Sequence, residues 1–323
     1  MTPRPRIGLP VARIDALDEL LARPPAPAPP PPPPRHARTP DEPADPDAVL
    51  RDYVLAPYPP LADPRGGLAA VNLLVESFAL AGVEAPGVAL VERLRQQLGR
   101  GRVVWGIKHR GAALAWEFYV YDPGNQRAEA TPAAVLAALD GVVAAPTLSR
   151  APIAAHMWSL ALDATTLIDR GTPTLTLYTS GADTPGASRS YTIEPDGTPT
   201  LANLYTFHDP RREPHAILAR LAASVHLGGD PRGAAAVIEP GLQRCRRLCV
   251  ANKRHADGLY FAGVDTDRTV QFLLRHDWPA PLTALLDARR AAFAHLAWDL
   301  AVDVHAGAEG APVLTRTAIH ATC

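Results

Sequence analysis

Two stretches of alternating side chains, Val103–His109 and Leu114–Tyr121, constrain the fold of this 323-residue chain more than any other feature. Successive side chains of a β-strand point to opposite faces, so each stretch predicts a strand with one apolar and one polar face. Arg110-Gly111 supplies a turn between them, and helical apolar spacing precedes them. The pattern predicts an antiparallel hairpin whose apolar face is covered by helices and whose polar face lines a pocket. The polar face carries Lys108, Glu117, Tyr119 and Tyr121.

Similar strand pairs recur along the chain, and apolar residues at helical spacing lie between most of them. Including the first pair, the predicted strands are 103–109 with 114–121, 153–162 with 174–180, 188–194 with 200–207, 242–253 with 259–264, and 298–305 with 313–320. Helices are predicted over residues 68–81, 88–98, 131–142, 213–226, 266–275 and 282–296.

Five antiparallel pairs with helices between them indicate an α+β fold built from a repeated helix–helix–strand–strand unit, ααββ. A closed antiparallel ten-stranded β-barrel surrounded by helices fits this pattern, because closure removes sheet edges and leaves an interior wide enough for a ligand. An open sheet with helices on one face fits less well, because its polar face would be exposed to solvent. The middle pair, 188–207, has no helical pattern before it, so five complete repeats are not assured.

The domain organisation follows from a proline-rich segment near the N-terminus. Residues 24–48 are of low complexity and contain the unbroken run Pro29–Pro34, which cannot join a helix or a sheet interior. We interpret residues 1–48 as a flexible Pro-rich N-terminal arm with a short helix at Val11–Ala22, and residues 49–323 as a single ααββ-barrel catalytic domain. The arm is either a tether or a weak proline ligand for an SH3-like partner.

Composition excludes several classes of function. A net charge of −1 argues against partners such as nucleic acid or an anionic membrane, which need a basic surface. The first residues lack a signal-peptide core, and no window reaches the roughly 18 apolar residues of a membrane span. We therefore expect a cytoplasmic protein without membrane insertion. Cys245, Cys249 and Cys323 show neither zinc nor disulfide spacing, which indicates reduced, buried thiols.

Short motifs in three places resemble one known family. The segment Gly101–Tyr121, GRVVWGIKHRGAALAWEFYVY, resembles the first strand pair of the soluble aromatic prenyltransferases with the ααββ barrel, also called the PT-barrel or ABBA fold. Lys253–Phe261, KRHADGLYF, resembles the basic turn and LYF strand of that family, and the closing strand with Arg316 has a counterpart. The aspartate-rich DDxxD motif of all-helical isoprenoid enzymes is absent from the sequence.

The resemblance implies an activity and a set of site residues. Enzymes of this family transfer an isoprenoid group from an allylic diphosphate to an electron-rich aromatic acceptor, here a small aromatic molecule or a peptide side chain. Glu117 matches the acidic residue that helps to hold Mg²⁺ in some members. Arg254, or its neighbour Lys253, and Arg316 match the residues that bind the diphosphate. Tyr260 matches the tyrosine that faces the active site.

The chemistry of the residues agrees with such a site. Ionisation of an allylic diphosphate yields pyrophosphate and a carbocation, so the site needs cations for the phosphates and aromatic faces for the carbocation. The predicted cations are Lys108, Lys253, Arg254 and Arg316, and the predicted aromatic shield is Tyr119, Tyr121, Tyr178, Tyr205 and Tyr260. The predicted catalytic residues are Glu117 and Tyr260, with Glu117 binding the expected Mg²⁺ or taking the acceptor's proton.

Structural readings of the same residues remain open. Tyrosine is common in strands because aromatic rings fit pleated surfaces, and an ion pair with Lys108 across the hairpin would explain Glu117 without catalysis. The alternative function is a non-catalytic barrel that binds a hydrophobic small molecule or a partner peptide. Convergence of several lysine or arginine side chains at one end of the barrel would favour the transferase.

Overall fold

The structure is a computed structural model that describes residues 41–52, 56–122, 127–180, 187–224, 226, 239, 241–307 and 312–322. Most of the predicted Pro-rich arm, including its short helix at 11–22, lies outside the described residues, as does Cys323. Residues from Pro40 onward form one compact unit, the barrel domain described below.

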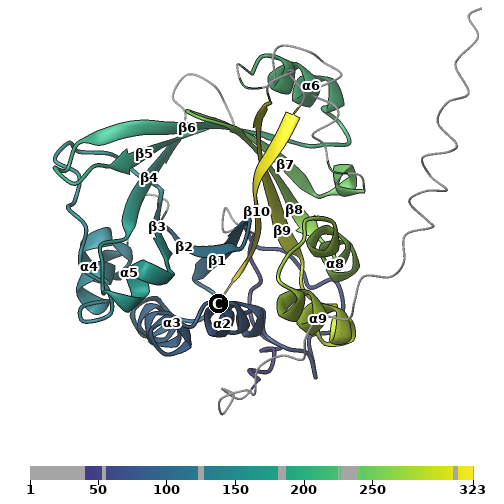
Figure 1. The fold of residues 1–323 in the computed structure, drawn as a ribbon, viewed down its shortest axis with the longest axis horizontal. Helices are drawn as coiled ribbons and strands as arrows, with labels where there is room; N and C mark the ends of the chain where they lie inside the picture. The colour runs from purple at the N-terminus through teal and green to yellow at the C-terminus, as the bar shows by residue number, and fades with distance from the viewer. Residues whose placement is uncertain are drawn as a thin grey trace, which may run out of the picture. The chain divides into compact units, whose positions relative to one another are not determined.

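Ten antiparallel strands form a closed barrel, which confirms the predicted fold class (Figure 1). Each strand pairs with its neighbours in the chain, and the last strand closes the barrel by pairing with the first, for example Lys108 with Ala318. The strands are β1 (Val103–Arg110), β2 (Ala113–Tyr121), β3 (Met157–Asp163), β4 (Thr174–Ser180), β5 (Ala187–Ile193), β6 (Pro199–His208), β7 (Arg247–Lys253), β8 (Asp257–Val264), β9 (Trp298–Ala306) and β10 (Pro312–Thr322).

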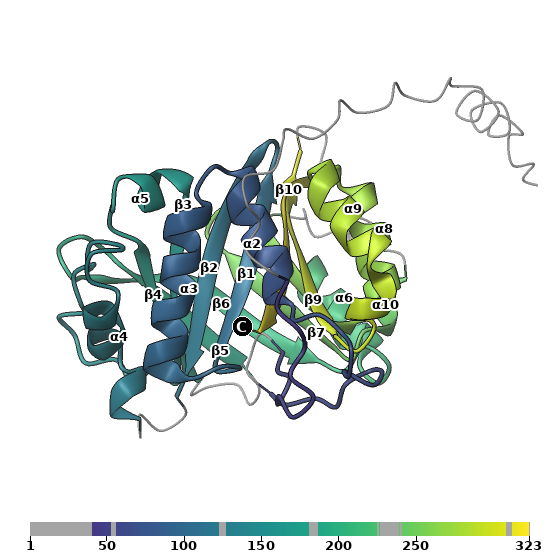
Figure 2. The ribbon, with the colours of Figure 1, turned by 90° about the horizontal axis from the view of Figure 1, so that it is seen from below.

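Helices lie outside the barrel wall (Figures 1 and 2). Helices α2 and α3 pack on β1, and α8 packs on β9. The described helices are α2 (Val71–Leu80), α3 (Glu84–Leu98), α4 (Pro132–Ala138), α5 (Ala164–Ile168), α6 (Pro214–Ala222), α8 (Thr266–Arg275), α9 (Ala280–Ala288) and α10 (Arg290–Phe293), with short 3₁₀ turns η1 (Ala128–Ala130) and η2 (Leu242–Arg244). Within the described ranges, none of them has the length and apolar content that a bilayer crossing requires.

The main hydrophobic core lies between the barrel wall and these helices. The apolar faces of β1 and β2, including Trp105, Trp116 and Phe118, are fully buried in it, as the hairpin pattern predicts. Tryptophan N–H groups on the wall are satisfied from outside the barrel, because Trp116 Nε1 donates to Ser77 Oγ at 2.9 Å and Trp298 Nε1 donates to Thr266 Oγ1 at 3.0 Å. These hydrogen bonds tie the helices to the strands and leave the opposite strand faces for the lumen.

The helical layer departs from the predicted repeat in two places. Helix α5 lies inside the β3–β4 pair, where no helix is predicted, and its N-cap Asp163 accepts from the Thr166 backbone N–H at 2.8 Å. No helix in the described part of the chain lies between β4 and β5, and Leu201 and Leu204 on β6 are exposed. The described residues therefore do not form five complete ααββ units, although they form all five strand pairs.

Several element boundaries also differ from their predicted positions. Residues 242–244 form a 3₁₀ turn rather than the start of β7, and the predicted helix 282–296 is divided into α9 and α10. Residues 41–48, which the sequence pattern assigns to the arm, contact the barrel domain. Glu42 accepts two hydrogen bonds from Arg95, at 2.7 and 3.0 Å, and one from Arg100 at 2.8 Å.

Candidate functional site

The polar strand faces enclose a cavity of about 880 Å³ in the barrel lumen. This volume lies in the range of sites that hold a small-molecule ligand. Most of the predicted site residues line it: Lys108, Glu117, Tyr119, Tyr121, Tyr178, Tyr205, Lys253, Tyr260 and Arg316. Arg254 does not, because it is exposed in the turn between β7 and β8 while its neighbour Lys253 faces the lumen.

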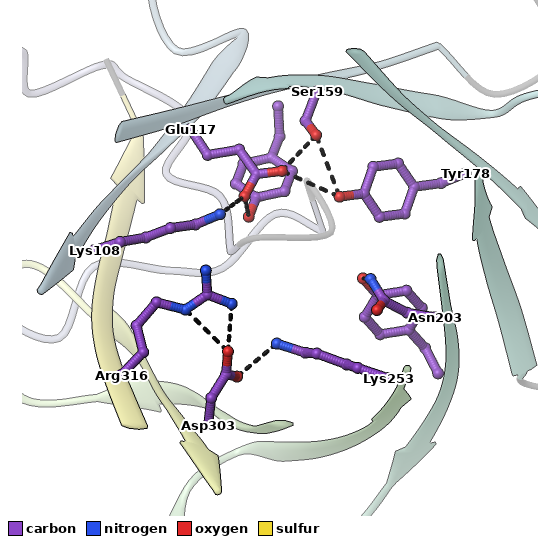
Figure 3. A network of polar contacts seen from close by, with 10 residues as sticks. Lys108, Glu117, Ser159, Tyr178, Asn203, Lys253, Asp303 and Arg316 are labelled. Carbon is purple, nitrogen blue, oxygen red and sulfur yellow. Dashed lines mark hydrogen bonds and ion pairs between the residues drawn. The ribbon is translucent and has the colours of Figure 1, made fainter. Parts of the chain in front are cut away.

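Glu117, on β2, is the centre of a buried polar network (Figure 3). Lys108 on β1 forms an ion pair with its Oε2, and the Tyr119 hydroxyl donates to the same oxygen at 2.8 Å. The other oxygen, Oε1, accepts from Ser159 Oγ on β3 at 2.5 Å and from the Tyr178 hydroxyl on β4 at 3.3 Å. Both carboxylate oxygens are therefore held by donors from four adjacent strands.

This network sets the protonation state of Glu117. Burial by itself raises the pKa of the carboxyl group, but the Lys108 ammonium and the hydroxyl donors outweigh it and lower the pKa to about 2. Glu117 is consequently ionised at neutral pH and a weak proton acceptor. Its clearest structural role is to hold Lys108 and two phenols at fixed positions in the lumen.

A second carboxylate, Asp303 on β9, joins the other two cations of the cavity (Figure 3). Lys253 Nζ lies 2.5 Å from Asp303 Oδ1, while Arg316 Nε donates to Oδ2 at 2.9 Å and its guanidinium makes a second contact with the same oxygen. Gly258 leaves room for this pairing, because a Cβ at that position would lie 2.8 Å from Lys253 Cε. Three cations and two carboxylates thus share one end of the cavity, which we call the charged end.

Aromatic rings form a continuous belt around the lumen next to the charged end. Tyr119, Tyr178, Tyr205, Tyr260 and His320 follow one another with centroid separations of 6.3, 5.9, 6.4 and 6.0 Å, and His320 lies 5.9 Å from Tyr119. Aromatic pairs at this spacing attract one another. Lys253 Nζ lies 5.4 Å from the centroid of the Tyr260 ring. The rings come from β2, β4, β6, β8 and β10, so closure of the barrel completes the belt.

The belt is electrically neutral. Burial raises the pKa of the phenols Tyr119, Tyr178, Tyr205 and Tyr260, so all four keep their protons at neutral pH. Burial lowers the pKa of His320 to about 4, which leaves its imidazole uncharged. His320 Nδ1 lies 3.2 Å from the Asp299 carbonyl oxygen, a contact that assigns the ring proton to Nδ1. Neutral π faces of this kind stabilise a cation without forming a bond to it.

The donor set around Glu117 does not fit the predicted Mg²⁺ site. Mg²⁺ needs an octahedral set of oxygen ligands, but both Glu117 oxygens already accept from Lys108 and from hydroxyl groups. Within the part of the chain that the structure describes, no cluster of three or more acidic, histidine or cysteine side chains could hold a metal ion. Dependence on Mg²⁺ stays a prediction, which a binding titration with and without the metal tests.

No family model matches the chain. No curated protein matches it. The site therefore has to be interpreted from its own residues.

Several residues of the site are not singled out by sequence reasoning. Ser159 lies two positions from apolar residues on the lumen face of β3, and Asn203 lies two positions before Tyr205, a predicted lumen residue of β6. Strict alternation along each strand could therefore have found both residues. Asn203 Nδ2 donates to the Tyr205 hydroxyl at 2.7 Å. Alternation also places Asp303 and His320 on the polar faces of their strands, but it does not reveal that Asp303 meets Lys253 or that His320 meets Tyr119, because these partners lie on strands that are distant in sequence.

Proposed function

We propose that this protein is an aromatic prenyltransferase, which moves an isoprenoid group from an allylic diphosphate to an electron-rich acceptor inside the barrel. The observation that carries the proposal is the convergence of Lys108, Lys253 and Arg316 at one end of the cavity, directly beside the aromatic belt. Cations suit a diphosphate leaving group, and neutral π faces suit the carbocation that it leaves behind.

The proposed reaction divides between these two regions. At the charged end, Lys108, Lys253 and Arg316 stabilise the negative charge that develops on pyrophosphate as the allylic C–O bond breaks and its electron pair stays with the oxygen. The belt shields the allyl cation from water until an aromatic carbon of the acceptor attacks it. The released pyrophosphate is itself a base and takes the proton that the acceptor loses. With a pKa of about 2, Glu117 acts by positioning Lys108.

Binding of a non-reactive donor tests the proposal. Dimethylallyl and geranyl thio-diphosphates are titrated into the protein by calorimetry, with Mg²⁺ and with EDTA. We expect micromolar binding that weakens by about tenfold or more in Arg316→Ala and Lys253→Ala, since a hydrogen bond to a charged group contributes about 1.5–3 kcal/mol. Arg254→Ala is the matched control, because this exposed arginine next to Lys253 does not line the cavity.

Each outcome has a definite meaning. Equal weakening in Arg254→Ala would show that long-range charge, rather than the cavity, attracts the diphosphate. Absence of binding by both analogues, with and without metal, would contradict the transferase and leave a barrel that binds a different hydrophobic ligand. Dependence on Mg²⁺ would show that the ion pairs of Glu117 rearrange when a metal and diphosphate arrive together.

A further inference from the structure

The lining of the cavity divides into a charged part and an uncharged part. Its charged side chains lie on β1, β2, β7 and β10 and on the segment before α2. The described lining residues of β3, β4, β5 and β6 are all uncharged, and many of them are small alanine, serine and threonine side chains. We call these lining residues of β3 to β6 the uncharged wall. In Figure 3, its residues Tyr178 and Asn203 lie across the lumen from Lys108 and Arg316.

Two threonine side chains stand next to each other on the uncharged wall. Thr176 on β4 and Thr192 on β5 are direct partners in the strand register, and such partners have Cβ atoms about 4.5–5.5 Å apart. Both residues line the cavity, although Thr176 is 8 % exposed. Within the residues that the structure describes, neither hydroxyl group has a hydrogen-bond partner. Both hydroxyl groups are therefore available to a molecule in the cavity, and binding it would satisfy them.

Asn203 carries the uncharged wall to the edge of the charged end. It is the register partner of Lys253 on β7, and its Nδ2 donates to the Tyr205 hydroxyl at 2.7 Å. This hydrogen bond fixes the amide group beside a ring of the aromatic belt. A ligand on the uncharged wall therefore lies next to the cations that the proposed diphosphate would occupy.

Belt rings supply the apolar part of the same wall. Tyr178 and Tyr205 lie with ring centroids 5.9 Å apart, and both line the cavity. Thr176 precedes Tyr178 by two residues on the same face of β4, a separation of about 7 Å along the strand. One small aromatic molecule can therefore pack against the belt and reach the threonine hydroxyls at the same time.

The chemistry of the uncharged wall selects one class of ligand. Threonine hydroxyls and an asparagine amide donate and accept hydrogen bonds but supply no charge. A carboxylate held there would lose its water without gaining a cation, which is unfavourable. A phenol hydroxyl also donates and accepts, so it can bond to two threonine hydroxyls at once, whereas an indole N–H only donates. The wall thus matches an uncharged phenol.

We propose that the uncharged wall binds an uncharged phenol, whose hydroxyl group is bound by Thr176 and Thr192 and whose ring packs against the belt tyrosines of β4 and β6. The role of this phenol as the acceptor rests on the proposed function; its binding does not. In that role, the wall presents an electron-rich ring to the allyl cation from the side of the lumen opposite Lys108 and Arg316. The two threonines thereby determine the specificity for the acceptor.

A phenol and its methyl ether test the uncharged wall without any transfer reaction. 2-Naphthol and 2-methoxynaphthalene share one ring system, but only 2-naphthol donates a hydrogen bond. Fluorescence titration measures the binding of each probe to the full-length protein. We expect 2-naphthol to bind about tenfold more tightly than the ether, and the double variant Thr176→Val with Thr192→Val to abolish this preference, because valine keeps the shape of threonine and lacks its hydroxyl group.

Two further variants serve as controls. Thr176→Ser with Thr192→Ser keeps both hydroxyl groups and should keep the preference. Thr179→Val tests the substitution itself, because Thr179 lies on the opposite face of β4 and does not line the cavity. Near-ultraviolet circular dichroism and geranyl thio-diphosphate binding report whether the variants keep the fold and the charged end. If the double valine variant does not fold, Thr192→Val alone, at the less buried position, should reduce the preference.

The outcomes separate this site from the proposed transfer reaction. A loss of preference in the valine variant with unchanged thio-diphosphate binding supports the phenol site. If the thio-diphosphates bind to no form but the preference depends on the two threonines, the phenol site stands while the transferase fails. Equal binding of the two naphthalene probes, binding of neither, or a preference that survives in the valine variant overturns the site. An equal loss of indole binding in the valine variant would overturn the assignment to a phenol.

Discussion

Gly106 lies directly beneath the imidazole of His320, so closely that a Cβ at position 106 would lie 2.5 Å from His320 Cδ2 and 2.8 Å from Nε2. The two residues pair across β1 and β10, the strands that close the barrel. His320 completes the aromatic belt between Tyr119 and Tyr260. The missing side chain at position 106 therefore provides the space that the belt needs at the closing seam.

This contact predicts that Gly106→Ala destabilises the protein. His320 is fully buried, so the added methyl group displaces the imidazole or the backbone, and overpacking of this kind costs about 1–3 kcal/mol. Urea unfolding measures the change. Gly171→Ala is the control, because its Cβ would meet the nearest atom at an ordinary 3.5 Å. Equal stability of Gly106→Ala and the control would contradict the proposed packing.

Glu117→Gln should destabilise the protein because it leaves the buried Lys108 without its carboxylate partner. The substitution removes the charge opposite the buried Lys108, and breaking a buried ion pair in this way costs about 3–5 kcal/mol. The double variant Glu117→Gln with Lys108→Met removes both charges and should recover part of the loss. A double variant that is less stable than Glu117→Gln would show that the hydroxyl donors, rather than Lys108, depend on the carboxylate.

Acid should destabilise the protein in two successive pH windows. The pKa of His320 is lowered from about 6.5 to about 4, so the unfolded state binds its proton more readily; the resulting stability is complete above pH 6.5 and is lost as the pH falls through 4. The pKa of Glu117 is lowered from 4.5 to about 2, so this residue contributes stability that is complete above pH 4.5 and is lost as the pH falls toward 2.

The first window is isolated by measuring the urea midpoints of wild type and His320→Gln at pH 7 and at pH 5. The wild type should lose more stability than His320→Gln on this change, by an amount of order 1–2 kcal/mol. Parallel losses would place another titrating group in that range.

Gly258→Ala should impair binding at the charged end more than it impairs folding. Its Cβ would lie 2.8 Å from Lys253 Cε and 3.0 Å from Asp303 Oδ1, and the flexible lysine can move away at low cost. Displacement of Lys253 should weaken the binding of geranyl thio-diphosphate by about tenfold, while the free energy of unfolding changes by less than about 1 kcal/mol. In a Lys253→Ala background the same substitution should have no further effect on binding. An additional loss there would place the effect of Gly258 on Asp303 or Arg316 instead.

The two basic residues at the β7–β8 turn show where local pattern stops being informative. Lys253 and Arg254 are adjacent, and the family resemblance points to either of them. A shift of one residue moves a side chain to the opposite face of a strand, so the strand register decides which one enters the lumen. In the register of β7 with β8, Lys253 is the last residue of β7 and its side chain contacts Asp303. Arg254 follows in the turn and is exposed.

Helix α5 is a local feature that apolar periodicity does not reveal. It is a single short turn of helix between two paired strands, and its signal is the cap Asp163 followed by Thr166 rather than an apolar stripe. The missed helix does not alter the lumen, because β3 and β4 still pair directly, as Ser159 with Thr176.

The sequence by itself determined the hairpin of β1 and β2, the barrel class, and the lumen face of Glu117 and most of the tyrosines, because alternation along a strand is a local property. Tertiary structure alone decided which of these side chains meet. The belt, the ion pair of Asp303 with Lys253 and the ion pair of Asp52 with Arg246 join strands and segments that are far apart in sequence. Such contacts depend on strand register and on closure of β10 onto β1, and no local pattern encodes either of them.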